Sequence, residues 1–198
     1  MLKPGVTLYY VRHGETEWNL AKRYQGQRDI PLNATGRMQA ARNGGVLAQT
    51  LAGDAATFDY VASPLARARE TMEIVRRELK LAPGDYRTDE RLKEIHYGHW
   101  EGLLWDDLPR LDPAGVAART ADTWGWQPVG GESFQALSRR VEGWLAEISR
   151  NSVIVAHGGV SRALRGLALG LPTAEIASLP VPQDQVLVIE RGGGMRWL

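Results

Sequence analysis

The sequence contains no cysteine, which excludes disulfides, catalysis by a thiol and zinc sites built on cysteine. This absence leaves the redox compartment undecided. The chain also lacks an excess of one charge sign: its net charge is +1, so no global basic field marks a nucleic-acid binder. No apolar run approaches the roughly 18 residues of a membrane span, and Lys3-Pro4-Gly5 precedes only a short apolar stretch. We therefore expect a soluble cytoplasmic protein with no membrane partner.

What remains is an ordinary globular composition. The chain has 198 residues, of which 43% are hydrophobic, and it shows no internal repeat or low-complexity segment. That length suits one sizeable domain with a substantial core, so we predict a single domain over residues 1–198. Seven tryptophans are many for this length, and four of them fall between residues 100 and 126.

Short apolar strands alternate with amphipathic helices along most of the chain. The pattern predicts strands over residues 7–11, 59–62, 86–88, 152–156 and 185–190. It predicts helices over residues 15–20, from Asn33 or Thr35 to Leu51, from about Pro64 to Leu79, and over 132–149 and 160–169. Such alternation is typical of a three-layer α/β/α sandwich with a mainly parallel central sheet. A turn at Gly192 to Gly194 is expected to fold the last strand into a short terminal hairpin.

Residues 92–130 break this alternation. They contain several prolines and the four clustered tryptophans, and they end at a Gly130-Gly131 pair. A stretch of this length and composition is more typical of a functional loop than of sheet, so we predict a small lid or side-wall insertion over residues 96–131. Its tryptophans serve either the core of the lid or contacts with a substrate, and the sequence leaves both open.

The stretch that organises the chain runs from Tyr9 to Thr16. Apolar residues lead into Arg12-His13, and Gly14 then permits a sharp turn. A strand that ends on charged residues delivers them to the carboxyl edge of a sheet, where open α/β folds bind ligands. Arginine is a fork-shaped donor for phosphate or carboxylate, and the adjacent histidine can act as nucleophile, base or metal ligand.

A second predicted strand ends in the same way, at His157-Gly158-Gly159. If the two strands are neighbours, His13 and His157 meet at one edge of the sheet. Arg67, at the start of a helix, and Glu94, just after a strand, are expected at the same edge. The transition state of phosphoryl transfer carries charge on its equatorial oxygens, so a site with fixed positive charge suits it. The histidine and arginine cluster therefore predicts a site where a histidine meets an anion.

Four strings, in order along the chain, resemble the histidine phosphatase superfamily, also called the phosphoglycerate mutase-like family. They lie at residues 12–19, 63–71, 94–102 and 157–159. The first reads Arg-His-Gly-Glu-Thr-Glu-Trp-Asn, and the third places Glu94 before Tyr-Gly-His-Trp-Glu-Gly. One such string is weak; four in order over nearly all the chain make chance agreement improbable.

The resemblance implies a metal-independent, two-step phosphomonoesterase with no cofactor. His13 is implied to be the nucleophile that becomes a phosphohistidine, and its other nitrogen should donate to a backbone carbonyl or similar acceptor. Glu94 is implied to protonate the leaving alkoxide and then to help deprotonate the attacking water. The groups implied to hold the phosphoryl oxygens or the substrate are Arg12, Arg67, His157, Asn19, Gln25, Gly26 and Gly158.

Two other functions stay open beside the phosphatase. A mutase of the family needs extra cations in the lid, and residues 100–126 offer only Arg110 and Arg119, so we favour hydrolysis of small organic phosphate esters. The other is a non-catalytic relative that binds partners through the same fold. The physiological substrate is not predicted; broad specificity and an α-ribazole phosphate or sugar phosphate specialist are both plausible. The chain is expected to be a monomer or a homodimer, with 176–181 as one candidate contact surface or a buried loop.

Several nearby residues have more ordinary interpretations. Arg69 is expected in a surface pair and Glu101 in the fold of its turn. His96 and His99 are expected to line or cap the entrance rather than to bind metal together with His157. The remaining open question is whether a second carboxylate shares proton donation with Glu94, the candidates being Asp106, Asp107 and Glu132.

Overall fold

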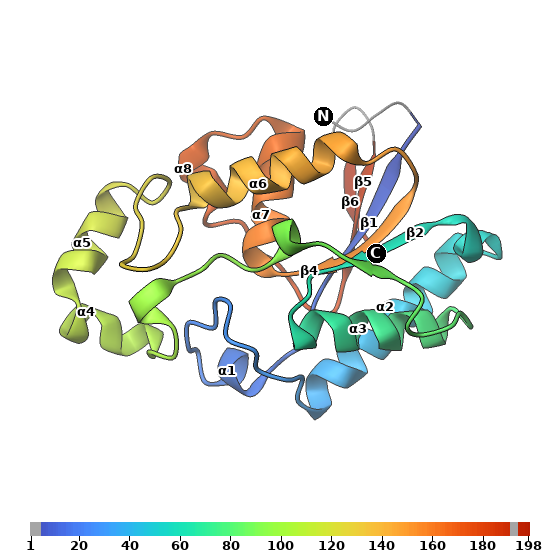
Figure 1. Ribbon diagram of the computed structural model, residues 1–198, viewed down its shortest axis with the longest axis horizontal. Coiled ribbons are helices and arrows are strands. Elements are labelled where there is room, and N and C mark those ends of the chain that lie inside the picture. Colours follow the sequence, from blue (N-terminus) through green and yellow to red (C-terminus); the bar gives the residue numbers. More distant parts are fainter. Residues whose placement is uncertain (1–4, 191–193) are drawn as a thin grey trace.

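The computed structural model describes residues 5–190 and 194–198, and within them the strands form one six-stranded sheet in the order β3-β2-β4-β1-β5-β6 (Figure 1). The strands are β1 Thr7–Arg12, β2 Asp59–Ala62, β3 Arg87–Thr88, β4 Ser152–Ala156, β5 Val186–Glu190 and β6 Met195–Trp197. The first four are mutually parallel, which confirms the mainly parallel sheet. The sheet is mixed, however, because β5 runs antiparallel to β1 and β6 antiparallel to β5. Residues 192–193 of the predicted terminal turn lie outside the described residues.

The neighbouring strands β1 and β4 position the two histidines. Their register places Arg12 opposite Ala156, so the chains leave the sheet side by side at His13 and His157. The amide of His13 continues the ladder by donating to the Ala156 carbonyl at 2.9 Å. The condition set by the sequence, that these two strands are adjacent, is therefore met.

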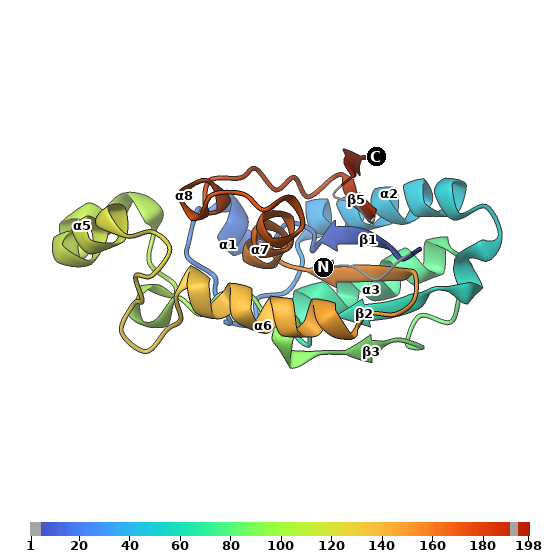
Figure 2. The same ribbon diagram turned by 90° about the horizontal axis from the view of Figure 1, so that it is seen from above.

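Helices cover both faces of the sheet and complete the predicted three-layer sandwich (Figures 1 and 2). Helices α2 (Ala34–Leu51) and α3 (Ala66–Glu78) pack on one face, and α6 (Phe134–Glu147) and α7 (Gly158–Leu169) on the other. Residues of β1 alternate between the layers: Tyr10 belongs to the core beneath α6 and α7, and Val11 to the core beneath α2 and α3. Every residue of β4 is buried, as expected for a central parallel strand.

Capping residues set the helix starts. The side chain of Asn33, one of two predicted caps, accepts from the Gly36 amide and begins α2. Ser133 caps α6 in the same way, so that helix begins two residues later than predicted. Helix α7 begins directly after His157, earlier than the predicted Val160, and α3 begins at Ala66. Gly44 fits within α2 because a side chain there would meet the Cβ of Glu78 at 2.7 Å.

The predicted insertion forms short helices at one end of the sandwich. Figure 2 shows α5 standing well away from the sheet. The remaining helical segments are α1 Glu17–Leu20, α4 Leu108–Leu111, α5 Pro113–Ala121 and α8 Thr173–Ile176, with single 3₁₀ turns at Asp54–Thr57, Glu90–Leu92, Gly98–Trp100 and Trp105–Asp107. The fully buried Trp100 forms the lid core, with its ring centroid 4.4 Å from that of Trp126. The exact extent of the insertion, 96–131, and the one-domain boundary stay predictions.

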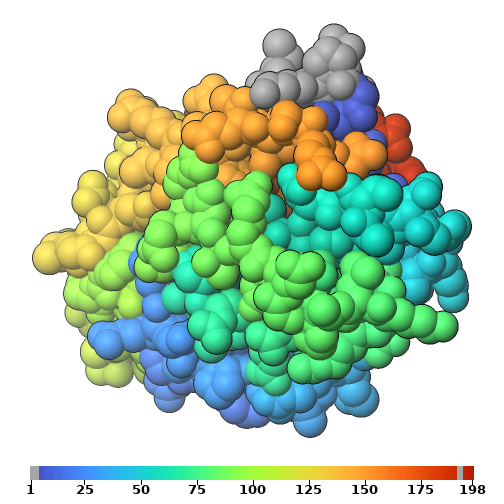
Figure 3. All heavy atoms as spheres, turned by 45° about the vertical axis from the view of Figure 1, so that its right-hand side comes forward, coloured from blue at the N-terminus to red at the C-terminus, as the bar shows by residue number. Residues whose placement is uncertain are grey.

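Two surface expectations bear on the described part of the chain. Ile176 and Val181 are buried, whereas Ser178 and Pro180 are exposed, so both interpretations of residues 176–181, a contact surface and a buried loop, stay predictions. No helix among the described residues is both long and apolar enough to cross a membrane. In Figure 3 the green segment that follows β3 lies against the orange helix α6.

Candidate active site

A cavity of about 140 Å³ opens at the carboxyl edge of β1 and β4. Every predicted site residue except His157 lines it. The lining residues are Arg12, His13, Asn19, Arg23, Tyr24, Gln25, Gly26, Arg67, Glu94, Tyr97, Trp105, Gly158 and Arg162. His157 is fully buried beside His13, with the ring centroids 5.1 Å apart. The topology thus brings residues from four distant strings into one place.

The hydrogen bond of its Nδ1 fixes the tautomer of the buried His13. Nδ1 lies 2.7 Å from the carbonyl oxygen of Gly14, and because a carbonyl can only accept, Nδ1 carries the proton. Nε2 therefore presents a lone pair, and the Nε–H of Arg67 approaches it at 3.3 Å. The hydrogen bond from Nδ1 to the Gly14 carbonyl fulfils the expectation that the non-attacking nitrogen donates to a backbone carbonyl.

The surroundings of His13 keep its ring neutral. Burial lowers the pKa of His13 well below its ordinary value of 6.5, and the charges of Arg67 and Arg12 lower it further. The hydrogen bond to Gly14 acts in the opposite direction but does not offset these effects. A neutral ring, with a lone pair rather than a proton on Nε2, is the form that can attack phosphorus.

The low pKa of His13 predicts that the nucleophile stays active in mild acid. Protonation removes the lone pair, so activity falls only as pH drops through the lowered pKa, and the acid limb should lie below pH 6.5. Histidine Cε1–H signals from NMR should show His13 unprotonated from pH 8 to about pH 6, whereas the urea-unfolded chain titrates near 6.5. A His13 signal that shifts through half its range at or above pH 6.5 in the folded protein would contradict this.

Arg67 links α3 to the loop that precedes α2. Its side chain is fully buried, and its two terminal nitrogens donate to the carbonyls of Gly26 and Arg28, each at 2.7 Å. Burial lowers the pKa of Arg67 to about 10, so the guanidinium remains charged at neutral pH. Gly26 has a φ of +50°, and a side chain there would collide with the carboxylate of Glu101. The loop can therefore hold its carbonyls on Arg67 only with glycine at this position.

Arg12 and His157 each keep a buried nitrogen for a ligand. Nη1 of Arg12 donates to the Val181 carbonyl at 2.6 Å, while its Nε has no hydrogen-bond partner among the described residues. Nε2 of His157 lies 2.7 Å from the hydroxyl of Ser63, and its Nδ1 likewise has no partner there. Burial, followed by the charge of Arg67, lowers the pKa of His157 well below its ordinary value. Unpaired buried nitrogens are costly, and an anion in the cavity can accept from the Nε–H of Arg12.

Glu94 approaches from the segment that leads to the lid. Its carboxylate accepts from the amide of Ile95 at 2.9 Å and from the amide of Gly159, in the first turn of α7, at 3.0 Å. The carboxylate thus stands between the helix that follows His157 and the cavity that it lines. This is the side of the site at which a leaving group can receive a proton.

The two predicted amide side chains use their oxygens within the protein. Oδ1 of Asn19 accepts from the Thr16 amide at 3.2 Å and from Gln183 at 3.3 Å. Oε1 of Gln25 accepts from the Thr16 hydroxyl at 2.9 Å. Each residue therefore has its amide NH₂ group left to donate to a phosphoryl oxygen. Gly158 lines the cavity through its backbone, at the first position of α7.

The structure adds cavity residues that the sequence did not single out. Arg23, Tyr24, Tyr97 and Arg162 line the cavity. Arg162 lies one helical turn after Gly158, and that spacing is a usable signal because residues four apart share a helix face. Trp105, which the sequence left between lid core and substrate contact, also lines the cavity.

Other expectations near the site need correction. Neither His96 nor His99 lines the cavity: Nδ1 of His96 accepts from the Gly98 amide, and Nε2 of His99 lies 3.0 Å from a carboxylate oxygen of Asp112. Both rings are used in the turn and the lid.

No group of three or more His, Asp or Glu residues within the described chain is arranged to hold a metal ion. The open carboxylate candidates Asp106, Asp107 and Glu132 are absent from the cavity lining.

Glu101 serves the fold of its turn, as expected, whereas the surface pair expected of Arg69 stays a prediction. The buried carboxylate of Glu101 accepts from the amides of Gln27 at 2.9 Å and Tyr97 at 3.2 Å, and so ties the lid turn to the loop that carries Gly26. Arg69 is exposed and does not line the cavity.

Comparison with known proteins agrees with the geometry. The model of the histidine phosphatase superfamily (branch 1) matches residues 8–198. The chain is 34% identical to glucosyl-3-phosphoglycerate phosphatase of Mycobacterium tuberculosis, over 87% of this chain and 79% of that protein. It is 35% identical to a probable phosphoglycerate mutase of Salmonella paratyphi A, over 83% and 75%. The crystal structure of the alpha-ribazole phosphatase from Shigella flexneri superposes with a TM-score of 0.80 at 31% identity, over 96% of this chain and 93% of that one.

Proposed function

We propose a function from the premise that the chain belongs to the histidine phosphatase superfamily. In this proposal the enzyme hydrolyses phosphate monoesters of small organic alcohols, and His13 carries the phosphoryl group between two half-reactions. The observation that supports it most strongly is the hydrogen bond between Nδ1 of His13 and the Gly14 carbonyl. It leaves Nε2 unprotonated in a cavity that Arg12 and Arg67 make positive.

In the first half-reaction Nε2 of His13 attacks phosphorus while the phosphorus–oxygen bond to the alcohol breaks. Glu94 gives its proton to the departing alkoxide. The negative phosphoryl oxygens are held by Arg12, Arg67 and the free Nδ1 of His157, with the amide of Asn19 as a further donor. No metal is needed in this scheme because the arginines supply the neutralising charge.

In the second half-reaction Glu94, now ionised, accepts a proton from water. The resulting hydroxide forms a bond to phosphorus as the bond to Nε2 of His13 breaks, which releases inorganic phosphate and restores both groups. The arginines keep the same contacts throughout, because the charged oxygens remain in place while the axial groups exchange.

Three aromatic rings support the choice of an organic leaving group. Tyr24, Tyr97 and Trp105 line the cavity, and the ring of Tyr24 lies 4.8 Å from that of Tyr97 and 5.9 Å from that of Trp105. Such a wall offers apolar area and ring edges to the alcohol part of an ester. Broad specificity remains a prediction, as does specialisation on one such ester.

A phosphoglycerate mutase is the second candidate. Arg23 and Arg162 line the cavity and can serve the second anionic group that a mutase substrate carries. The lid supplies no such charge, because Arg110 is exposed beside Asp107, and Arg119 donates to the hydroxyl of Tyr24 from outside the lining. This distribution favours transfer to water.

Oxygen labelling in excess EDTA tests the proposal. Wild-type enzyme should hydrolyse p-nitrophenyl phosphate and 2-glycerol phosphate without loss of rate when EDTA is added. In ¹⁸O-water the released phosphate should gain a single solvent oxygen, because water attacks phosphorus once in each turnover. Loss of activity in EDTA that added divalent metal restores would contradict metal independence. Efficient conversion of 3-phosphoglycerate with a bisphosphoglycerate primer, with little hydrolysis, would move the assignment to the mutase.

Location and assembly also stay proposals. We expect the enzyme to work in the cytoplasm as a monomer or homodimer, on a small molecule and without nucleic acid. The near-neutral net charge of +1 supports the last point.

A further inference from the structure

The backbone around Glu94 has little regular structure of its own. The residue follows the 3₁₀ turn Glu90–Leu92 and precedes the lid, so its backbone belongs to no strand or helix, although the Gly159 amide of α7 donates to its carboxylate. Its carboxylate nevertheless has to stay near the leaving group, and a displacement of about 1 Å can cost two orders of magnitude in rate. Something outside the segment must therefore hold it.

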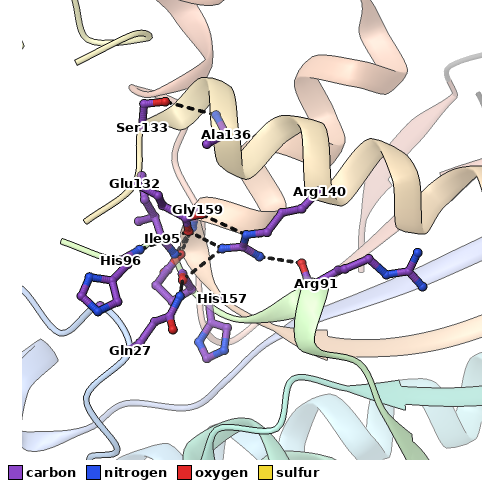
Figure 4. Close-up of polar contacts among 12 residues, drawn as sticks. Gln27, Arg91, Ile95, His96, Glu132, Ser133, Ala136, Arg140, His157 and Gly159 are labelled. Atoms are coloured by element: carbon purple, nitrogen blue, oxygen red, sulfur yellow. Dashed lines mark hydrogen bonds and ion pairs between the residues drawn. The ribbon is translucent and has the colours of Figure 1, made fainter. Parts of the chain in front are cut away.

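Arg140 provides that hold from helix α6. Its Nη1 donates to the carbonyl of Arg91 at 2.5 Å (Figure 4). Its Nη2 donates to the carbonyl of Glu94 at 3.1 Å. The planar guanidinium thus bridges two turns of the same loop from one rigid helix. A fork of fixed geometry suits this task better than a point charge does.

Glu132, the residue before the Ser133 cap of α6, pairs with Arg140 and contacts the same loop. Its carboxylate pairs with Arg140 through two contacts, of 2.5 and 3.1 Å, and both side chains are only about one-fifth exposed, at 19% and 20%. It also accepts from the amide of His96 at 3.1 Å, while its own amide donates to the His96 carbonyl at 2.8 Å. The pair therefore binds the backbone at Arg91 and at His96, which lie on either side of Glu94 in the sequence; Figure 4 labels Arg91, His96 and the two side chains of the pair.

We infer that Arg140, paired with Glu132, is a positioning residue for the proton transfer that Glu94 performs. The inference rests on the proposed role of Glu94 as the acid. Arg140 does not line the cavity, so it acts on the reaction only through the loop that it holds. Gln27 also donates to the Glu94 carbonyl, at 3.0 Å. This residue lies on a loop, however, and unlike Arg140 its side chain does not also bind the Arg91 carbonyl.

A positioning role makes a specific kinetic prediction, because leaving groups differ in their need for a proton. An alkoxide leaves only when protonated, whereas 2,4-dinitrophenolate leaves without help. Arg140→Met should lower kcat/KM on 2-glycerol phosphate by about tenfold to a hundredfold, part of the full contribution of an acid catalyst. On 2,4-dinitrophenyl phosphate the loss in kcat/KM should be no more than about threefold, since kcat/KM reports the first half-reaction, in which this leaving group needs no proton. The water attack that Glu94 assists later is common to both substrates and does not enter kcat/KM.

Matched variants separate this role from a general effect on the fold. Arg139→Met changes the neighbouring, exposed arginine of the same helix and should leave both rates unaltered. Arg140→Met leaves the mostly buried Glu132 carboxylate without its cation, which destabilises the fold, so Glu132→Gln/Arg140→Met should regain stability without regaining kcat/KM on 2-glycerol phosphate. Arg140→Lys keeps the charge but cannot bridge both carbonyls. It should therefore also lose activity on 2-glycerol phosphate while keeping it on 2,4-dinitrophenyl phosphate. All assays are run well below each variant's unfolding midpoint.

Glu94→Gln, measured on the same two substrates, distinguishes the two ways in which the inference can fail. Equal losses on both substrates for Arg140→Met, with Glu94→Gln still selective, would overturn the positioning role alone. If Glu94→Gln itself fails to discriminate between the substrates, the proposed acid is wrong and the inference falls with it. Selective loss in both variants supports both assignments.

Discussion

His13→Ala is expected to lower kcat for phosphate ester hydrolysis by at least about 10⁴-fold, the scale seen when a covalent nucleophile is removed. No nearby group can replace it. The other buried ring, His157, has its Nε2 engaged by Ser63 at 2.7 Å, and the proposed mechanism uses its Nδ1 to hold the phosphoryl oxygens rather than to attack. Arg12 and Arg67 can still bind the ester, so KM should change far less than kcat.

Two measurements check this expectation. Steady-state rates on p-nitrophenyl phosphate in EDTA give the loss, and an alkaline quench with ³²P-labelled substrate should trap a labelled protein in wild type but not in His13→Ala. The control is His99→Ala, since His99 is exposed and contacts Asp112 in the lid. Trapped label in His13→Ala, at a rate that matches its turnover, would place the nucleophile elsewhere.

The sheet could largely be predicted from the sequence because its signals are local. The apolar run before Arg12 and the one before His157 each predict a strand without knowledge of the other. Their adjacency could not be predicted in this way, since pairing depends on the whole topology. The antiparallel direction of β5 has the same character: residues 185–190 read as a strand in either direction, and only packing beside β1 decides it.

The candidate site likewise contains residues that could be predicted from local sequence and contacts that could not. Residues that belong to contiguous strings, such as Arg67 and Glu94, could be assigned from a resemblance, and the structure brings them to one cavity. Contacts between distant segments could not. Arg140 lies 46 residues from Glu94, and its role depends on how α6 packs over a loop without regular structure. For His96 and His99 the residue type alone led to the prediction that they line or cap the entrance of the site. The structure instead places the ring of His96 against the Gly98 amide and that of His99 against Asp112.

Arg67→Met is expected to reduce activity and stability together, because the same guanidinium serves the phosphoryl group and the fold. Removing one fixed donor to a developing charge costs about 10²- to 10³-fold in kcat. The side chain is fully buried, and its loss leaves the carbonyls of Gly26 and Arg28 without their donor. Each unsatisfied buried acceptor costs about 1 to 3 kcal/mol in the free energy of unfolding. The loop that carries Gln25 should loosen as a result.

The same variant tests the electrostatic account of His13. The Arg67 charge is the second cause of the lowered His13 pKa, after burial, so its removal should raise that pKa and move the acid limb of kcat/KM to higher pH. Urea unfolding, kcat and the pH profile are measured for Arg67→Met and for the control Arg69→Met. The control alters an exposed arginine two residues further along the same helix. A variant that lost stability but kept wild-type kcat and an unshifted acid limb would make Arg67 a purely structural residue. The geometry argues against that outcome, because its Nε lies 3.3 Å from the nitrogen that must attack phosphorus.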